Sequence, residues 1–338
     1  MAAVRTIDWV DGAVVILDQT ALPHEVRSLT LTDVDGLADA IRRLAVRGAP
    51  ALGAAGALGV LLALRQARAE DWDDAGLATA LERLRRARPT AVNLAWGVDR
   101  VTDRLPQGEE AVMAEALAVL EEDVAVNRAM GQRGADLVEA LCGGRPAGLR
   151  LHTHCNAGGL AAVEVGTALE VVRALHARGR VERVYADETR PLLQGSRLTA
   201  WELDRMGADY RVVVDGAGPS LIARGLVDAV VVGSDRIAAS GDVANKIGTY
   251  PLALAAAREG VPFVVVAPES TIDPGTHDGA AIAIEDRDPE EVLTWGGVRV
   301  APAGAEAVNP AFDVTPADLV TAIVTERRVV RPAAGERP

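Results

Sequence analysis

Hydrophobic positions follow different periods in the two halves of the chain. From about Thr32 to Leu141, apolar residues recur at spacings of three and four, as in Leu77, Leu81 and Leu84, and this is the period of an amphipathic helix. From Leu149 onward, short β-branched runs alternate with amphipathic stretches. This pattern predicts strands at 149–153, 184–186, 211–214, 229–232 and 262–266, and helices at 160–178, 195–206 and 244–259. Alternating strands and helices favour an α/β fold with a mostly parallel sheet.

Two local signals divide the chain further. Residues 7–17 form two short apolar runs around Asp11-Gly12, which predicts a strand pair joined by a tight turn. Gly143-Gly144-Arg145-Pro146 interrupts the helical period. We therefore predict a mainly helical N-terminal domain with a small β element over residues 1–142, and an α/β domain over residues 143–338.

Composition narrows the class of protein. Hydrophobic residues make up 49% of the 338 positions and charged residues 25%, as in folded globular proteins. No apolar run approaches the roughly 20 residues of a membrane helix, and residues 1–20 lack the pattern of a secretory signal, so we expect a cytoplasmic protein without a membrane partner. The net charge of -13 argues against nucleic acid as a partner but leaves a small anionic substrate open. Two cysteines exclude a disulfide framework.

One compositional detail singles out a residue. Of the 35 basic residues, Lys246 is the only lysine. An ammonium group is a compact point charge and differs from a planar guanidinium in geometry and hydration. Lys246 is thus either a chance survivor of the arginine bias or a residue whose compact charge is needed.

Polar residues follow the predicted strands of the second half. They are Cys155 with Asn156, Asp187, Asp215, Asp235 and Glu269-Ser270. Open parallel sheets bind ligands beyond the carboxyl ends of their strands. Any one of these residues can be a loop residue or a helix cap, but their recurrence after successive strands indicates a site at one rim of the sheet.

Two arginines precede predicted helix starts that carry proline. Arg47-Gly48-Ala49-Pro50 offers free backbone amides, a helix dipole and a guanidinium, all of which suit a phosphate group. An ordinary helix start is the alternative, with Gly53, Gly56 and Gly59 allowing a second helix to pack closely. Arg88-Pro89 repeats the arrangement.

The strand-end residues differ in the chemistry that they suggest. His152 and His154 have the spacing of metal ligands, but the other three histidines sit in unsuitable contexts, so we expect no metal. Cys155 precedes a predicted helix, whose N-terminus would favour a thiolate. Asp235 follows an apolar strand, which suits a general acid, although Arg236 opposes that effect. No Walker loop, dinucleotide-binding glycine motif or nucleophile elbow occurs.

Six motifs follow one another in order along nearly the whole chain. They are Val46-Arg47-Gly48-Ala49-Pro50, Arg88-Pro89-Thr90-Ala91-Val92-Asn93-Leu94, Thr153-His154-Cys155-Asn156-Ala157-Gly158, Tyr185-Ala186-Asp187-Glu188-Thr189-Arg190-Pro191 with Gln194-Gly195, Asp242-Val243-Ala244-Asn245-Lys246-Ile247-Gly248-Thr249-Tyr250, and Asn309-Pro310-Ala311-Phe312-Asp313-Val314-Thr315-Pro316. In this order and combination they resemble the methylthioribose-1-phosphate isomerase family, which is related to the alpha, beta and delta regulatory subunits of the eukaryotic initiation factor 2B exchange factor.

The resemblance implies a fold, an activity and a set of site residues. It implies a Rossmann-like C-terminal domain, a homodimer and a cofactor-free aldose-ketose isomerase of methionine salvage that converts 5-methylthioribose 1-phosphate to 5-methylthioribulose 1-phosphate. It also implies Asp235 as the acid at the ring oxygen and Cys155 in the hydrogen transfer. The implied substrate-binding residues are Arg47, Gly48, Ala49, Arg88, Gln194, Asn245 and Lys246.

Two departures from the family pattern bear on the substrate. Ser234 stands where the family commonly has alanine, and Asp215-Gly216-Ala217-Gly218-Pro219 replaces a common Asp-Asn loop at the ligand rim. The sugar carbon-5 substituent therefore stays open, with 5-deoxyribose 1-phosphate and ribose 1,5-bisphosphate as alternative substrates. A non-catalytic regulatory protein that senses a sugar phosphate or nucleotide is the alternative from another class.

Overall fold

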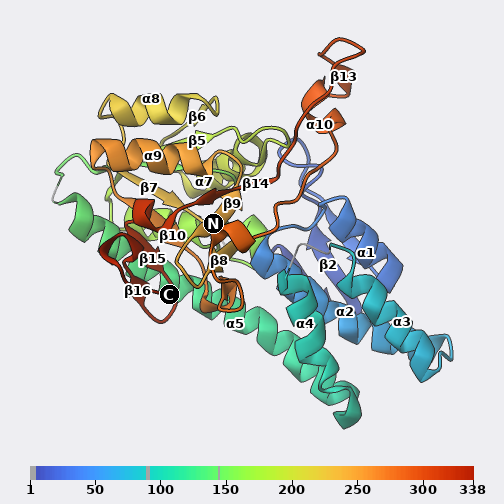
Figure 1. Ribbon diagram of the computed structural model, residues 1–338. Coiled ribbons are helices and arrows are strands. Elements are labelled where there is room, and N and C mark those ends of the chain that lie inside the picture. The colour runs from blue at the N-terminus through green and yellow to red at the C-terminus, as the bar shows by residue number, and fades with distance from the viewer. Residues whose placement is uncertain (1–4, 89–91, 144) are drawn as a thin grey trace. The chain divides into compact units, whose positions relative to one another are not determined.

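The computed structural model describes residues 5–88, 92–143 and 145–338, and the chain forms two compact units. Unit 1 comprises Met1–Ala129 and Ala157–Glu170, and unit 2 comprises Met130–Asn156 and Val171–Pro338. The expected α/β class, with a helical N-terminal part and a parallel sheet, is confirmed (Figure 1). The predicted boundary coincides with the end of α5 (Glu109–Cys142), whereas the compact units divide within this helix. Gly144 of the predicted linker lies outside the described residues.

A three-stranded antiparallel sheet opens unit 1. It consists of β1 (Ile7–Val10), β2 (Ala13–Leu17) and β3 (Ser28–Leu31) in the order β1-β2-β3. Asp11 and Gly12, with φ values of 49° and 89°, make the predicted turn between β1 and β2. Two central turn residues at positive φ match the twist of a hairpin, which explains why the Asp-Gly signal was readable from sequence.

Helices fill the rest of unit 1. They are α1 (Val34–Arg42), α2 (Ala49–Ala69), α3 (Asp74–Arg85), α4 (Val92–Thr102), the 3-10 turn η1 (Leu105–Gln107) and the first part of α5. The side chains of Asp33 and Asp73 accept the first free amides of α1 and α3, as N-cap residues do. The proline-started helix predicted after Arg88 is α4 from Val92, and residues 89–91 lie outside the described part.

Helix α2 is the centre of the unit 1 core. Every residue from Ala51 to Ala63 is buried, so its length and apolar composition, which would also suit a membrane helix, belong to a core helix. A Cβ on Gly56 would lie 2.4 Å from the Leu94 carbonyl oxygen, and one on Gly97 would lie 2.0 Å from the Gly53 carbonyl oxygen. Packing of the α2 glycines against another helix, α4, is therefore confirmed.

Unit 2 contains a seven-stranded sheet in which six strands, all except β16, run parallel. The order is β16-β15-β10-β7-β4-β5-β6, and only β16 runs antiparallel to its neighbour among the described strands. The strands are β4 (Leu149–Thr153), β5 (Val181–Asp187), β6 (Tyr210–Val213), β7 (Ala229–Val232), β10 (Phe263–Val266), β15 (Ala322–Val324) and β16 (Val329–Val330). Five of them fall where the sequence predicts strands.

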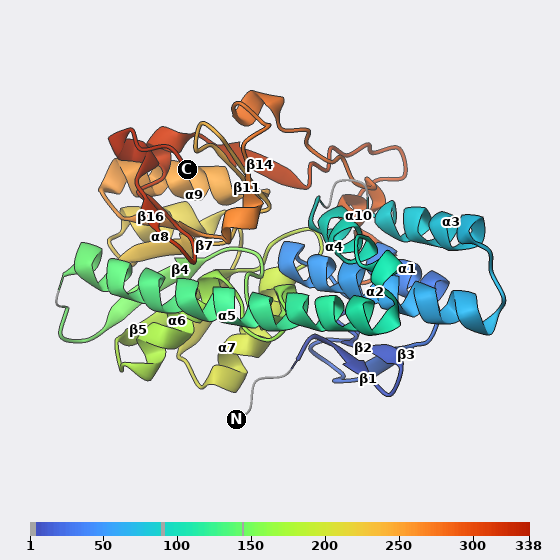
Figure 2. The ribbon, with the colours of Figure 1, turned by 90° about the horizontal axis from the view of Figure 1, so that it is seen from below.

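Helices cover both faces of this sheet. Figure 2 shows α8 (Ala217–Ala223) and α9 (Thr249–Glu259) on one face, and α6 (Ala168–Ala177) and α7 (Ala200–Met206) on the other. The fully buried strands β7 and β10 consist of Ala229-Val230-Val231-Val232 and Phe263-Val264-Val265-Val266, the continuous apolar runs expected when both faces are covered.

A second, smaller sheet of unit 2 has the order β11-β8-β9-β14. Its strands are β11 (Ile272–Asp273), β8 (Arg236–Ala238), β9 (Val243–Lys246) and β14 (Phe312–Thr315). Helix α10 (Glu290–Leu293) precedes a separate hairpin of β12 (Thr294–Trp295) and β13 (Val298–Arg299).

Two of the predicted helices are wrong at their N-terminal ends. Residues 243–246 are strand β9, paired antiparallel with β14, and α9 begins only at Thr249. Long-range pairing overrides the local helical pattern there. The helix predicted over 160–178 is a 3-10 turn, η2 (Gly159–Ala161), followed by α6 from Ala168. A Cβ on Gly166 would lie 2.3 Å from Gly158, so this loop is folded tightly on itself.

Candidate functional site

The strand order of unit 2 places two predicted catalytic residues at the switch point of its sheet. Read as β6-β5-β4-β7-β10-β15, the order is that of a doubly wound dinucleotide-fold sheet, whose topology reverses between β4 and β7. Cys155 follows β4 by two residues and Asp235 follows β7 by three. Ligands of such sheets bind in the crevice outside the carboxyl ends of these central strands.

Cys155 is held in an unusual backbone conformation. Its φ of 59° lies in the left-handed region, which non-glycine residues seldom adopt. Its amide donates a hydrogen bond to Thr189 Oγ1 at 2.9 Å, and its carbonyl oxygen accepts one from Thr199 Oγ1 at 2.5 Å. The side chain is half-buried, so the thiol is neither sequestered nor fully in solvent.

His154, the residue before Cys155, belongs to a buried cluster of two histidines and an aspartate. His154 Nδ1 is 2.8 Å from Asp187 Oδ2, and His154 Nε2 is 2.7 Å from the carbonyl oxygen of Ile247. His152 Nε2 lies 3.1 Å from the other Asp187 oxygen, without the angle of a hydrogen bond. All three side chains are almost completely buried. This cluster links the ends of β4 and β5 to the loop after β9.

The cluster favours charged His154 and charged Asp187. Burial lowers the pKa of His154, but the hydrogen bond and charge of Asp187 and the Ile247 carbonyl outweigh it, so that pKa is raised above its ordinary 6.5. Burial raises the pKa of Asp187, but His152 and His154 outweigh it and hold that pKa below 3.8. Each group is thus stabilised in the ionised form by its partner.

This cluster predicts a pH window for stability. The raised His154 pKa contributes stability below pH 6.5 that is lost as pH rises through the folded-state value, and the lowered Asp187 pKa contributes stability above pH 3.8 that is lost as pH falls. We expect Asp187→Asn to lower the free energy of unfolding by about 3 kcal/mol between these values, because it breaks a buried pair. The difference should shrink above this window, as measured by urea unfolding at several pH values.

The exposed His277, replaced by glutamine, is the control for this measurement. It should leave the pH dependence of unfolding close to wild type. A difference between wild type and Asp187→Asn that stays constant from acid to alkaline pH would contradict the assignment of charge to the cluster.

Asp235 and Asn245 lie across a hairpin from each other. The Asp235 amide donates to the Ala244 carbonyl oxygen at 3.0 Å, and β8 and β9 pair antiparallel immediately after it. Asp235 is exposed, whereas Asn245 is buried and donates to Thr249 Oγ1 at 3.0 Å. The hairpin therefore brings a predicted acid and a predicted binding residue to the same side of unit 2.

Lys246 ends β9 and is half-buried. Its Nζ donates to the Ala311 carbonyl oxygen at 2.8 Å and lies 4.5 Å from the centre of the Phe312 ring. Together these two contacts hold the ammonium group in one place at the end of β9. The single lysine is thus a positioned charge at the strand end.

Gln194 provides an independent sign of a binding site. It is only 7% exposed, and its Oε1 is a buried acceptor with no hydrogen-bond partner among the described residues. An unsatisfied buried acceptor costs free energy unless a ligand or water supplies a donor. Gln194 directly precedes a π-helix, η3 (Gly195–Thr199), a rare element that is frequent at functional sites.

Three of the four predicted phosphate residues of unit 1 lie at the start of α2. Gly48 is the N-cap residue with a φ of 98°, and a Cβ on it would lie 2.4 Å from the Ala161 carbonyl oxygen. Ala49 is the first helical residue, and Arg47 is buried at 9% exposure. Arg88 is half-buried in the bend before α4. The helix start predicted at Ala49-Pro50 is confirmed, while phosphate binding stays a prediction.

Within the described part of the chain, one group of side chains could coordinate a metal ion. One atom each of His154, Asp187 and Asp215 lie within 4.8 Å of one another. Both ring nitrogens of His154 are already in hydrogen bonds, and the two Asp215 oxygens accept the amides of Thr189 and Arg190 at 2.7 and 2.6 Å. Because the ligand atoms of His154 and Asp215 are occupied by hydrogen bonds within the protein, the geometry favours a hydrogen-bonded cluster.

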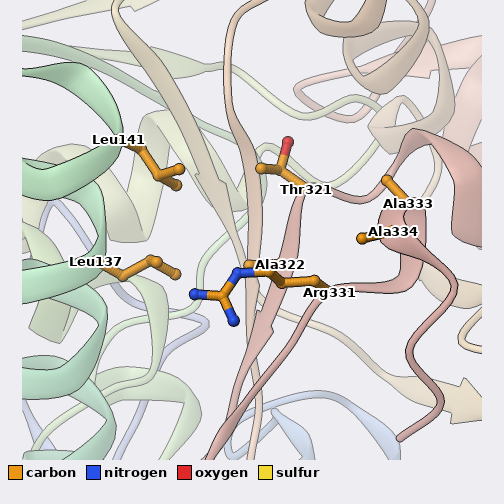
Figure 3. Close-up of a pocket in the computed structure, with 7 residues that line it drawn as sticks. All are labelled: Leu137, Leu141, Thr321, Ala322, Arg331, Ala333 and Ala334. Atoms are coloured by element: carbon orange, nitrogen blue, oxygen red, sulfur yellow. The ribbon is translucent and has the colours of Figure 1, made fainter.

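A pocket of about 310 Å³ lies elsewhere in unit 2 (Figure 3). Its lining consists of Leu137, Leu141, Thr321, Ala322, Arg331, Ala333 and Ala334. It contains none of the predicted site residues. It lies beside β15, away from the switch point between β4 and β7.

Sequence reasoning missed the two threonines that bond to the Cys155 backbone. Thr189 stands two residues after the last residue of β5, and Thr199 ends the π-helix. The strand-end rule selects Asp187 and Asp215 because carboxylates are conspicuous. A hydroxyl at the same rim carries no comparable signal until the backbone geometry is known.

Known proteins match nearly the whole chain. The model of the initiation factor 2 subunit family matches residues 45–332. The chain belongs to the initiation factor 2 subunit family. A methylthioribose-1-phosphate isomerase from Alkalilimnicola ehrlichii is 51% identical over 98% of this chain and 96% of its own length. A probable bifunctional methylthioribose-1-phosphate isomerase/methylthioribulose-1-phosphate dehydratase from Nocardia farcinica is 55% identical over 98% of this chain, which spans only 60% of that relative's length.

Solved structures of the family agree with this membership. A crystal structure of 5-methylthioribose 1-phosphate isomerase from Pyrococcus horikoshii has a TM-score of 0.88 at 42% identity and covers 97% of this chain and 92% of its own. The delta subunit of translation initiation factor eIF-2B from A. fulgidus has a TM-score of 0.86 at 42% identity, with 98% and 97% covered. The resemblance to the methylthioribose-1-phosphate isomerase family is thereby confirmed.

Proposed function

We propose that this protein is an aldose-ketose isomerase that converts 5-methylthioribose 1-phosphate to 5-methylthioribulose 1-phosphate. One observation carries the proposal: Cys155 and Asp235 follow the two strands that flank the switch point, in a chain about half identical to relatives named for this reaction. A cytoplasmic location, a homodimer and a reaction without a cofactor belong to the same proposal.

The substrate dictates what the site must supply. A sugar phosphorylated on its anomeric oxygen cannot open its ring by losing a hydroxyl proton from that oxygen. An acid must protonate the ring oxygen, and hydrogen must then move from carbon 2 to carbon 1. We assign the protonation to Asp235, which is exposed and follows β7 by three residues.

Cys155 takes the second step in this proposal. As a thiolate, it accepts the carbon-2 proton and returns it to carbon 1, or its side chain stabilises a direct hydride shift between the two carbons. In both routes the carbon-2 hydroxyl loses its proton as the ketone forms, and this proton replaces the one that Asp235 gave to the ring oxygen, so atoms and electrons balance. The half-buried setting suits either route, since partial exclusion of water strengthens local electrostatic interactions.

The remaining assignments concern binding. Gln194, with its unsatisfied buried oxygen, receives a sugar hydroxyl, and Asn245 and Lys246 bind substrate oxygens from the end of β9. Arg47, the free amides at Gly48 and Ala49, and Arg88 bind phosphate through charge and the dipole of α2. The arginine and lysine side chains supply the positive charge for phosphate binding, so this proposal includes no metal ion.

The alternatives differ in what they require. A non-catalytic sensor of sugar phosphates, the alternative from another class, would not need Cys155 and Asp235 together. Among related substrates, 5-deoxyribose 1-phosphate lacks only the methylthio group. Ribose 1,5-bisphosphate would place a second dianion where an apolar group is expected, and the Asp215 to Pro219 loop offers no cation to meet it.

Catalytic efficiencies on the three sugar phosphates test this proposal. We expect methylthioribose 1-phosphate to be best and 5-deoxyribose 1-phosphate to be accepted less well, because each of the two missing methylene-sized groups, the sulfur and the methyl, is worth roughly 1–3 kcal/mol. A clear preference for the bisphosphate would overturn the substrate assignment and leave the catalytic pair standing. No turnover of any of them would favour the regulatory alternative.

A further inference from the structure

Strained backbone is concentrated around Cys155. Six non-glycine residues among the described positions have positive φ, and three of them, Cys155 at 59°, Thr189 at 64° and Leu193 at 59°, lie at or near the ends of β4 and β5. Thr189 is β-branched, for which this region is especially unfavourable. Such strain persists only where the surrounding structure over-determines it, so the contacts that impose it are informative.

Two threonine hydroxyls hold the main chain of Cys155 from both sides. Thr189 Oγ1 accepts the Cys155 amide at 2.9 Å, and Thr199 Oγ1 donates to the Cys155 carbonyl oxygen at 2.5 Å. Thr199 Oγ1 also receives Asn156 Nδ2 at 3.3 Å. Because Asn156 occupies an acceptor position of that hydroxyl, its proton is directed to the Cys155 carbonyl.

Thr189 is itself fixed from the neighbouring strand ends. Its amide donates to Asp215 Oδ1 at 2.7 Å, and the next amide, that of Arg190, donates to Asp215 Oδ2 at 2.6 Å. Its hydroxyl donates to the Asp187 carbonyl oxygen at 3.1 Å. A continuous series of hydrogen bonds therefore runs from the end of β6 through the end of β5 to the residue after β4.

Thr199 is fixed by the π-helix that it ends. A Cβ on Gly195 would lie 1.6 Å from the Asp187 carbonyl oxygen, so the absence of a side chain lets this helix start directly against the end of β5. The helix then delivers the Thr199 hydroxyl to Cys155 within a single wide turn. The unusual helix and the left-handed Cys155 are parts of one arrangement.

We propose that Thr189 and Thr199 are positioning residues that clamp the Cys155 backbone and thereby aim its thiol at the reacting carbons. This inference rests on the proposed function of Cys155. It assigns to the strained loops a role in orientation: the hydroxyls make no contact with substrate and act only through Cys155.

Turnover by Thr199→Val and Thr189→Val tests the clamp. Valine keeps the β-branched shape and removes the hydrogen bond. We expect kcat to fall about 10–100-fold with KM within about twofold of wild type, because misplacing a catalytic group by 1 Å can cost about 100-fold. Thr199→Ser restores the hydroxyl and should recover most of kcat. Thr321→Val is the matched control, since its hydroxyl also accepts a backbone amide, at 3.0 Å, but at the opposite end of the sheet.

Alkylation of Cys155 by iodoacetamide provides a readout that needs no substrate. Cys142 is the only other cysteine, and burial together with the Asp228 charge raises its pKa to about 11, so labelling near neutral pH followed by mass spectrometry reports Cys155. We expect the alkylation rate to change at least about threefold in both valine variants, as the released loop redirects the thiol. Thr199→Ser and Thr321→Val should be alkylated at the wild-type rate.

The two readouts separate the clamp from the proposed function. Wild-type protein that turns over no sugar phosphate would refute the function, and the alkylation rates would then judge the clamp alone. Valine variants that keep wild-type kcat, or that alkylate at the wild-type rate, would overturn the clamp. A Thr199→Ser variant as impaired as Thr199→Val, with an unchanged unfolding midpoint, would do the same.

Discussion

Replacing Cys155 with serine is expected to remove most of the isomerase activity while leaving the fold intact. A hydroxyl is a far weaker acid than a thiol, so serine cannot supply the thiolate in the hydrogen transfer. We expect kcat to fall by about 10²–10⁴-fold, the usual contribution of a positioned acid-base group. The main-chain bonds to Thr189 and Thr199 do not involve the side chain and should persist. Steady-state kinetics and a thermal unfolding curve measure both parts.

Cys142→Ser is the matched control for this variant. Its Sγ lies 3.4 Å from the Asp228 carbonyl oxygen, away from the strand ends of the site, and a serine can make the same bond. It should retain wild-type turnover. Near wild-type kcat in Cys155→Ser, under conditions where chemistry limits the rate, would refute the role of Cys155.

Replacing Asp235 with asparagine is expected to have an effect of the same order, about 10²–10⁴-fold on kcat. The amide is isosteric with the carboxyl group but cannot deliver a proton to the ring oxygen. Because the backbone bond from Asp235 to Ala244 needs no side chain, the β8–β9 hairpin should keep its geometry. Substrate affinity should therefore change little, and a fall in kcat at constant KM is the expected signature.

Asp318→Asn provides the comparison, because Asp318 is also an exposed aspartate of unit 2. It should behave as wild type. If Asp235→Asn retained turnover, or lost it only through a higher KM, the acid at the ring oxygen would have to be another group.

The architecture of unit 2 could be predicted because its buried strands are marked by short local apolar runs in the sequence. Strand β7 matches its predicted range and β10 differs by one residue, because these buried parallel strands are continuous apolar runs rich in valine. Strand β9 was misread as helix because its residues are specified by pairing with β14, about 70 residues away in the chain. The local sequence of β9 does not indicate that β14 is its partner.

The part of the candidate site that lies at strand ends could also be predicted from the sequence. Reactive side chains at strand ends, such as Cys155 and Asp235, follow directly from the parallel-sheet rule. The buried charge cluster around Asp187 and the clamp by Thr189 and Thr199 depend on distances across neighbouring strands. The histidines at 152 and 154 illustrate the difference: their spacing suggested metal ligands, whereas the hydrogen bonds of His154 to Asp187 and Ile247 indicate an internal ion pair.

Direct observation of the product tests the central claim most sharply. The substrate is methylthioribose 1-phosphate labelled with carbon-13 at carbon 2, observed by NMR. After the purified protein is added, the labelled carbon should give the resonance of a ketone, and the phosphate should remain on carbon 1. We expect this signal with wild-type protein, and we expect it to appear at least about 100-fold more slowly with Cys155→Ser or Asp235→Asn at the same protein concentration. A wild-type sample in which the labelled carbon keeps its aldose resonance, at protein concentrations comparable with the substrate, would contradict the account.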